Sequence, residues 1–343
     1  MSPSGDYLAI LTRYTIYIAL VPDSSHLSGP DTGPVRVKMH HLGPTDHVAP
    51  TSQSTSRAAL VSALWHPLGV DGTCLVTVTD DAVVRVWELS VQDRYSFSEP
   101  KLSIDLKKLV DGTSQEQDFR ASKFDVKHGF SADSFEMEVA SACFGGRGSG
   151  MESGWAPMTL WIAMREGDVY ALCPLLPSKW QPPSTLIPSL SVSIVSKAAV
   201  IQNDTSVTED KRRLVQQQFQ WMADLDNQDP LVIDGEDEGE VPKEIYKRPA
   251  KPGAIPKLQG PFELELGMED DDIDTLVTDI YAIGPKVDAE ELMLGEEQDL
   301  DIEDLEGLSL GIVCIVTNKG RVTIYLDIDG VEAQWLPQKK VLS

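Results

Sequence analysis

Four segments of the chain share one pattern of apolar runs and polar turns. In each segment a β-rich run is followed by a tight polar turn and a second β-rich run, which is the local signature of a β-hairpin. The eight runs are Tyr7–Thr12 and Thr15–Leu20, Cys74–Thr79 and Val83–Leu89, Leu160–Met164 and Val169–Leu172, and Ile312–Thr317 and Val322–Leu326. A single hairpin is only marginally stable in water, so its repetition predicts units that stack on one another.

Further β-rich runs flank the last three hairpins and extend each unit to four strands. The preceding runs are Val61–Pro67, Met137–Cys143 and Leu276–Ile283, and the following runs are Lys101–Leu106, Ser191–Val195 and Val331–Trp335. Four antiparallel strands per unit are typical of a β-propeller blade. We therefore predict an all-β, WD-like β-propeller with about four blades in this chain. A β-sandwich, which also has many short strands, is the alternative fold.

The first unit and the number of units both indicate an incomplete ring. The segment Ser2–Asp6 resembles the turn between the first and second strands of a blade, so the first strand of that unit is missing. A propeller needs at least four complete blades and usually more. We expect the remaining blades to lie beyond Ser343, so that residues 1–343 form part of an N-terminal propeller domain.

The spacing between hairpins predicts long insertions. A compact four-stranded blade needs about 40 to 50 residues, and the steps between these hairpins are longer. The expected insertions lie at about 22–56, 111–134, 197–260 and 284–308. The first of them is rich in Ser, Pro, Gly, Thr and His and is expected to be a mobile loop.

The insertion at 197–260 contains the one convincing helix signal. Ser206 followed by Glu209 predicts a capping box, and Asp229 with Pro230 predicts the end of the helix. The apolar residues between them span about 160° of the helical wheel and are Leu214, Val215, Phe219, Trp221, Met222 and Leu225. This face either covers an edge of the propeller or forms part of a groove for a partner.

Two sets of residues are candidates for contacts with a partner. The first is on the predicted helix, because exposed aromatic side chains are frequent anchors of protein interfaces, and comprises Leu214, Phe219, Trp221 and Met222. The second is in and after a glycine-rich loop and comprises Phe144, Arg147 and Trp155. That loop runs into another strand and not into a helix, so it lacks the helix N-terminus that a phosphate-binding loop needs.

Charge is distributed unevenly along the chain. The formal net charge is −25, and residues 221–343, with 30 acidic and 10 basic residues, contribute −20 of it. An acidic surface repels the phosphate backbone, so direct binding of nucleic acid is disfavoured. The acidic stretches Asp224–Glu240, Glu263–Asp274 and Asp288–Glu306 are solvated loops or docking sites for basic partners.

The sequence offers no catalytic or metal-binding motif. The four cysteines, Cys74, Cys143, Cys173 and Cys314, form no C-x-x-C pair and are expected to be buried free thiols in a reducing compartment. His40, His41 and His47 lack thiolate partners at zinc-finger spacing. No nucleophile elbow, His-Glu-x-x-His helix or membrane-spanning apolar run is present. We predict neither an enzyme, a cofactor nor a metal site.

One segment resembles a known family. Cys143–Gly146, Gly154–Trp161 and Gly167–Pro177 resemble one blade of a fungal nucleoporin of the cytoplasmic face, nucleoporin eighty-two, the counterpart of animal nucleoporin eighty-eight. Ser2–Ile10 and Leu64–Gly69 fit the same family, as does the order of insertions, with a helix after the third blade. The resemblance covers most of the chain, and its specific part is the segment at 143–177.

The resemblance implies a structural protein of the nuclear pore complex. Members of this family have a seven-bladed propeller followed by coiled-coil helices. The implied partners are the helical tail of a helicase-recruiting repeat nucleoporin, the folded C-terminal domain of a second repeat nucleoporin, and coiled-coil partners beyond this chain. The implied place is the cytoplasmic side of the nuclear envelope, in the export of messenger RNA and ribosomal subunits. One alternative function is a WD-type adaptor in a ubiquitin ligase or trafficking coat. The other is a propeller enzyme, which would require carboxylates or histidines that converge on the central channel.

Overall fold

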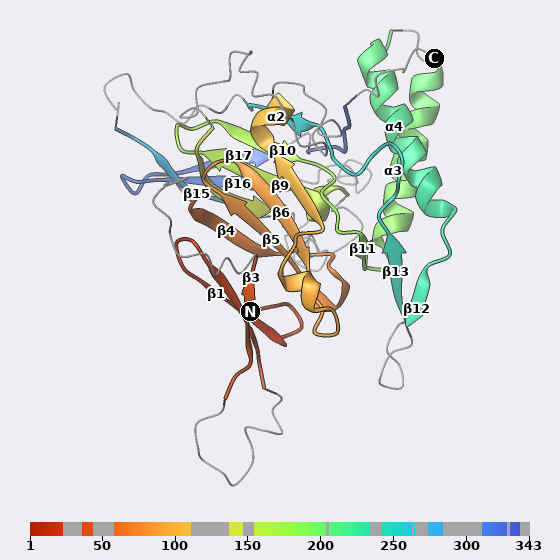
Figure 1. Cartoon of the computed structure of the whole chain (residues 1–343). Helices are drawn as coiled ribbons and strands as arrows, with labels where there is room; N and C mark the ends of the chain where they lie inside the picture. The colour runs from red at the N-terminus through yellow and green to blue at the C-terminus, as the bar shows by residue number, and fades with distance from the viewer. Residues whose placement is uncertain are drawn as a thin grey trace, which may run out of the picture. The chain divides into compact units, whose positions relative to one another are not determined.

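The computed structural model shows two compact units, Met1–Ser141 and Ala142–Ser343, built mostly from antiparallel strands (Figure 1). The structure describes residues 1–22, 36–43, 58–110, 137–146, 154–203, 206–233, 242–262, 264, 274–283, 311–327 and 330–336. The predicted insertions at 111–134 and 284–308 therefore lie outside the described residues, as do His47 and Arg147.

The first unit contains two of the predicted sheets. β1 (Tyr7–Leu11), β2 (Ile16–Leu20) and β3 (Met39–Leu42) form a three-stranded sheet in that order. β4 (Leu60–Trp65), β5 (Cys74–Thr79), β6 (Val83–Glu88) and β7 (Leu102–Asp105) form a four-stranded sheet. Short helical segments occur at Val70–Gly72, Arg94–Phe97 and, as α2, Leu106–Val110.

The prediction of a loop over the whole of 22–56 was wrong at its centre. Met39–Leu42 is β3, which pairs with β2 through Ile16↔Leu42 and Ala19↔Met39. This strand could not be predicted from the sequence, because it is only four residues long and lies within a mainly polar segment. The first sheet therefore has β1 at one edge and β3 at the other.

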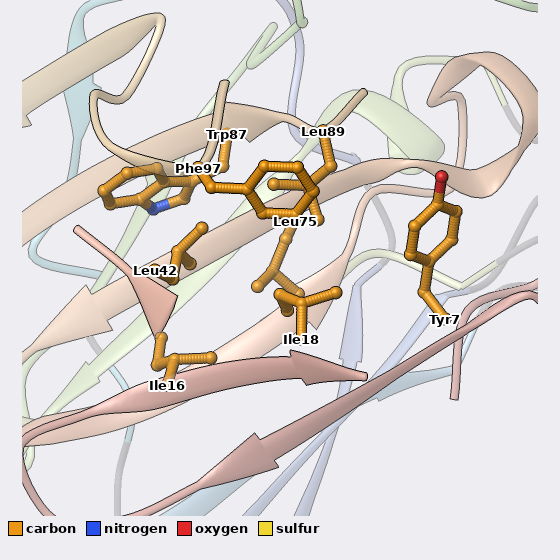
Figure 2. Close-up of a cluster of buried hydrophobic side chains, with 8 residues drawn as sticks. All are labelled: Tyr7, Ile16, Ile18, Leu42, Leu75, Trp87, Leu89 and Phe97. Atoms are coloured by element: carbon orange, nitrogen blue, oxygen red, sulfur yellow. The ribbon is translucent and has the colours of Figure 1, made fainter. Parts of the chain in front are cut away.

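The two sheets of the first unit share a hydrophobic core (Figure 2). Ile16, Ile18 and Leu42 come from the first sheet, and Leu75 and Trp87 come from the second. Ile18 and Leu75 are 0% exposed. The Trp87 indole NH donates a hydrogen bond of 3.0 Å to the Thr77 hydroxyl, which satisfies the polar atom of the buried ring. Face-to-face packing of successive sheets is what blade stacking requires.

The second unit contains two further sheets of the same kind. β8 (Val139–Phe144), which begins just before the unit boundary, β9 (Leu160–Met164), β10 (Val169–Leu172) and β14 (Leu258–Gln259) form a sheet in the order β14-β10-β9-β8. β15 (Val277–Ile283), β16 (Gly311–Thr317) and β17 (Val322–Asp327) form the other. The Val277 NH donates 2.9 Å to the Arg165 carbonyl and joins neighbouring sheets. All four predicted hairpins are thus confirmed.

The large insertion lies inside the third sheet and not after it. Between β10 and β14 the chain forms β11 (Lys179–Trp180), α3 (Leu186–Asn203), α4 (Glu209–Asp226), β12 (Leu231–Ile233) and β13 (Lys243–Lys247). β11, β13 and β12 form a small sheet in that order. The predicted bounds, 197–260, began too late because α3 starts at Leu186, and the fourth strand of the sheet is β14.

Two predicted outer strands were wrong. Ser191–Val195 lies inside α3, where Leu186, Leu190 and Ile194 recur every four residues and are buried. Val331–Trp335 belongs to no strand. It runs beside the insertion, where the Gln334 NH donates 3.1 Å to the Cys173 carbonyl and the Lys257 NH donates 2.8 Å to the Gln334 carbonyl.

Candidate functional site: the helical insertion

The helix α4 begins and ends close to the predicted positions. Its N-cap is Thr208, whose hydroxyl accepts a hydrogen bond of 3.4 Å from the Lys211 NH, so the assignment of the cap to Ser206 was wrong by two residues. Glu209 and Asp210 lie in the first turn, where carboxylates favour the positive end of the helix dipole. The helix ends at Asp226 with Asn227 as its C-cap.

The inward face of α4 contributes Trp221 to a cluster of three tryptophans, in which it packs against Trp155 and Trp180. Trp221 is 1% exposed and lies 5.1 Å from Trp155 between ring centroids, in an edge-to-face arrangement, and 6.3 Å from Trp180. Trp155 precedes a short helical segment at Ala156–Met158, and Trp180 comes from β11. Edge-to-face aromatic pairs add to the stabilisation that burial provides. The tryptophan cluster therefore fixes α4 against the body of the second unit.

A polar network holds the same helix to the segment 330–336, here called the strap. Gln218 is 0% exposed, and its side-chain amide donates 2.9 Å to a Glu332 carboxylate oxygen and 3.2 Å to the Ala333 carbonyl. Gln217 donates 3.2 Å to the Trp335 carbonyl and accepts 3.4 Å from its NH. The side chain of Lys197 on α3 forms an ion pair with Glu332. Both helices are thus fastened to the strap.

Glu332 is the titratable group at the centre of this network. Its burial disfavours the charged form, but hydrogen bonds from Lys197 and Gln218, with the charges of Lys197 and Lys211, outweigh burial and lower the pKa of Glu332 below its usual value. A carboxyl whose folded pKa is depressed contributes stability above its unfolded pKa and loses that contribution as the pH falls through the folded pKa.

We expect Glu332→Gln to make the protein less stable at pH 7, by about 1–3 kcal/mol, because the amide cannot replace a charged acceptor of two hydrogen bonds. The difference from wild type should shrink as the pH falls below the ordinary pKa of a glutamate and through the lower pKa of Glu332 in the folded protein, where its carboxyl becomes protonated. Denaturant unfolding of both proteins at several pH values measures it. A difference that is independent of pH would contradict the assignment of a depressed pKa to Glu332.

Both helices of the insertion carry exposed apolar side chains. Phe219 on α4 is 50% exposed, and on α3 Val192, Val195 and Val200 are 69%, 51% and 66% exposed. Exposed aromatic and aliphatic side chains on a rigid support are suited to contact with another protein. Of the six apolar residues that the sequence predicted on α4, Phe219 is therefore the one whose side chain is exposed to solvent.

The structure distributes the seven candidate contact residues between surface and interior. Trp221 and Met222 are buried, at 1% and 2% exposed, and Leu214 is half-buried. Phe144 is half-buried at the end of β8, Trp155 is 7% exposed, and Arg147 lies outside the described residues. The packing of Trp155 on Trp221 brings together the two sets that the sequence treated as separate. Their role in binding a partner stays a prediction.

Sequence reading missed α3, Trp180 and the glutamine contacts of the strap. A signal for α3 was available, because Leu186, Leu190 and Ile194 follow the helical spacing of four residues. Nothing in the sequence could have indicated the pairing of Gln217 and Gln218 with the strap, since more than a hundred positions separate them.

The cysteines of the described chain are free thiols. Burial raises the pKa of Cys173 and of Cys143 to about 12, and it raises the pKa of Cys74 well above its usual value. At neutral pH all three are therefore protonated and poor nucleophiles. Within the described residues, no group of three His, Cys, Asp or Glu side chains has an arrangement that could hold a metal ion. No helix among those residues is long and apolar enough to cross a membrane.

Comparisons with known proteins agree in one family. The family model described as the Nucleoporin NUP82 beta-propeller matches residues 1–343. Nucleoporin NUP82 of Chaetomium thermophilum is 54% identical over 99% of this chain and 38% of its own length. Nucleoporin nup82 of Schizosaccharomyces pombe is 26% identical over 66% of this chain and 25% of its own length. This chain thus spans well under half the length of these curated relatives.

Two solved structures resemble the whole fold. A chain in the crystal structure of the Chaetomium thermophilum heterotrimeric Nup82 NTD-Nup159 TAIL-Nup145N APD complex matches with a TM-score of 0.79 and 52% identity, over 100% of this chain and 60% of that one. A chain of the yeast heterotrimeric Nup82-Nup159-Nup116 nucleoporin complex matches with a TM-score of 0.56 and 15% identity, over 97% of this chain and 60% of that one, and shows the fold alone. The repeated antiparallel sheets are those of a β-propeller, and this chain belongs to the Nucleoporin NUP82 β-propeller family.

Proposed function

We propose that this chain is the propeller region of a structural nucleoporin and serves as a non-catalytic docking platform in the nuclear pore complex. The observation that carries this proposal is the match, over the full chain at 52% identity, to a chain solved within a heterotrimeric nucleoporin complex. The architecture suits the role, because sheets packed face to face form a rigid body whose loops and insertions are free to bind other proteins.

The proposed partners are two other nucleoporins and the coiled-coil proteins of the same assembly. The complex of the Chaetomium relative contains the Nup159 TAIL and the Nup145N APD. We assign to this chain the counterparts of both, one a helical tail of a helicase-recruiting repeat nucleoporin and the other a folded C-terminal domain. Coiled-coil helices and further blades beyond Ser343 would complete the protein.

The platform would act on the cytoplasmic side of the nuclear envelope and support the export of messenger RNA and ribosomal subunits. The net charge of −25 disfavours direct contact with RNA. Its contribution to export would therefore run through the proteins that it holds in place. The free thiols suit a reducing environment, although only Cys74 and Cys173 are buried as expected and Cys143 and Cys314 are half-buried.

The experiment that tests this function is co-purification of the chain, extended through its remaining blades, with each of the two nucleoporin segments. We expect both to elute with it in size-exclusion chromatography and each to bind alone in calorimetry. An extended chain that is folded by circular dichroism but binds neither segment would overturn the platform proposal. Recovery of ligase or coat subunits in place of nucleoporins from an extract would favour the adaptor alternative.

Phe219 is the residue through which the outward side of α4 would make its contact. Phe219→Ala should weaken the binding of one of the two segments by at least about tenfold, as loss of an aromatic interface anchor does, while the melting temperature stays close to wild type. The matched control is Tyr95→Ala in the first unit, since Tyr95 is also exposed, at 80%. Unchanged binding of both segments by Phe219→Ala would exclude α4 from the interface.

A further inference from the structure

The small sheet of the insertion ends in an unusual edge strand. β12 consists of Leu231, Val232 and Ile233, and their side chains are 61%, 52% and 40% exposed. Among the described strands β12 pairs only with β13, through Leu231↔Ile245, Val232↔Glu244 and Ile233↔Lys243. Within the part of the chain that the structure describes, the other edge of β12 is paired with no strand and lies beside these apolar side chains. Proteins usually protect such edges with charged residues or proline.

The strand next to β12, β13, is held in place by contacts with β11 and with the end of α4. The Trp180 indole NH donates 3.3 Å to the Lys247 carbonyl, and β11 pairs with β13 through Trp180↔Tyr246. Gln228 accepts 2.9 Å from the Lys247 NH and donates 3.1 Å to its carbonyl. The Ala250 NH donates 2.6 Å to Asp224 on α4. The edge is thus supported by the tryptophan cluster and by the end of α4, beside which the small sheet lies (Figure 1).

The stretch of sequence that contains β12 is acidic. Residues 224–247 contain nine acidic residues and two basic ones, a balance of −7. Asp226, Asp229 and Glu244 are exposed. Burial, the hydrogen bond that Tyr246 donates to Glu244, and the charges of Glu244 and Asp226 together raise the pKa of Tyr246 to about 12. One of the exposed carboxylates, that of Glu244, thus accepts a hydrogen bond of 2.8 Å from the Tyr246 hydroxyl of β13.

We propose that β12 is a docking edge for an extended segment of a partner protein in which apolar and basic residues alternate. The segment would add a fourth strand to the small sheet, as in β-strand addition. Its backbone would pair with the free edge of β12. Its apolar side chains would cover either Leu231 and Ile233, which share one face of the sheet, or Val232, which is on the other face. Its lysines and arginines would meet the exposed carboxylates of Asp226, Asp229 and Glu244.

The charge also argues against the simplest other occupant. A second copy of this chain pairing edge to edge would bring two segments of balance −7, on two chains of net charge −25, into contact. Like charges at short range oppose such a pairing. A basic segment of another protein has the complementary charge. The proposal is independent of the contact assigned to Phe219, because it rests on β12 and its neighbours.

The experiment uses three labelled peptides of about eight residues, a length that spans one strand. One alternates valine and lysine, the second alternates valine and glutamate, and the third is the valine-lysine peptide with backbone N-methyl groups on alternate residues. Fluorescence anisotropy with the folded chain should show binding of the first only. We expect Val232→Lys to weaken it by about tenfold or more, which corresponds to about 1.4 kcal/mol.

The matched control is Val91→Lys, which adds the same charge at a valine 47% exposed in the first unit and should bind like wild type. Equal binding of the N-methylated peptide to wild-type protein would rule out strand addition, whatever the variant does. Equal binding of the glutamate peptide, or no effect of Val232→Lys, would also overturn the proposal. Sedimentation supplies a further test. If the wild-type chain forms dimers and Val232→Lys abolishes them, the edge serves self-association and the proposal is wrong.

Discussion

Trp221→Ala should lower the free energy of unfolding by about 3–5 kcal/mol, the usual cost of removing a large buried aromatic side chain. The ring is 1% exposed and lies between Trp155 and Trp180, at 5.1 Å and 6.3 Å between centroids. Its removal breaks both aromatic contacts and leaves a cavity around which the neighbouring side chains relax only in part. Denaturant unfolding followed by circular dichroism measures the loss.

The matched control for Trp221→Ala is Phe219→Ala on the same helix. Phe219 is 50% exposed, so its truncation should change stability by less than about 1 kcal/mol. Hydrogen exchange of the α4 amides should accelerate in Trp221→Ala and remain near wild type in Phe219→Ala. Equal losses in the two variants, or a small loss in Trp221→Ala, would mean that the tryptophan cluster does not hold α4 in place.

Leu75→Ala should cost about 2–5 kcal/mol, which is the range for leucine truncation in a core that cannot collapse around the gap. Leu75 is 0% exposed and belongs to the cluster that joins the first two sheets, beside Ile18 and Trp87 (Figure 2). The loss tests whether successive sheets are stabilised by packing face to face. Thermal and denaturant unfolding of the variant measure it.

Leu8→Ala is the control for Leu75→Ala within the same unit. Leu8 lies on β1 and is 40% exposed, so its truncation removes far less buried apolar surface. We expect its cost to be well below that of Leu75→Ala. If the two variants lose the same stability, the core of the first unit does not lie between the first two sheets.

A variant that replaced both Phe219 and Trp221 could not separate an effect on stability from an effect on binding. The two residues are two positions apart, and at about 100° per residue they stand on opposite margins of the apolar face. The sequence places both on one face that spans about 160° and does not say which margin is covered. The structure covers Trp221 with Trp155 and Trp180 and leaves Phe219 at the surface. Single substitutions therefore separate the two roles.

Strand pairings between distant segments could not be predicted from the sequence. β14 has two residues and pairs with β10 through Leu172↔Leu258, across the whole insertion. A strand this short has no periodicity of its own to detect. In α3, the alternation of Ser191, Val192, Ser193 and Ile194 imitates a strand. Burial of Leu186, Leu190 and Ile194 stabilises the helix in its place, because tertiary contacts override local preference.

The sequence by itself determined the four hairpins, the all-β class, the helix α4 and the acidic charge of residues 221–343. These features depend on residues close to one another in the chain, so local periodicity and turn chemistry are sufficient to specify them. Only the tertiary structure decided which strand completes the third sheet, where Val331–Trp335 lies, and which side of α4 remains exposed. Those outcomes depend on side chains such as Gln218 and Trp180 that meet their partners across long loops, and no local pattern records such contacts.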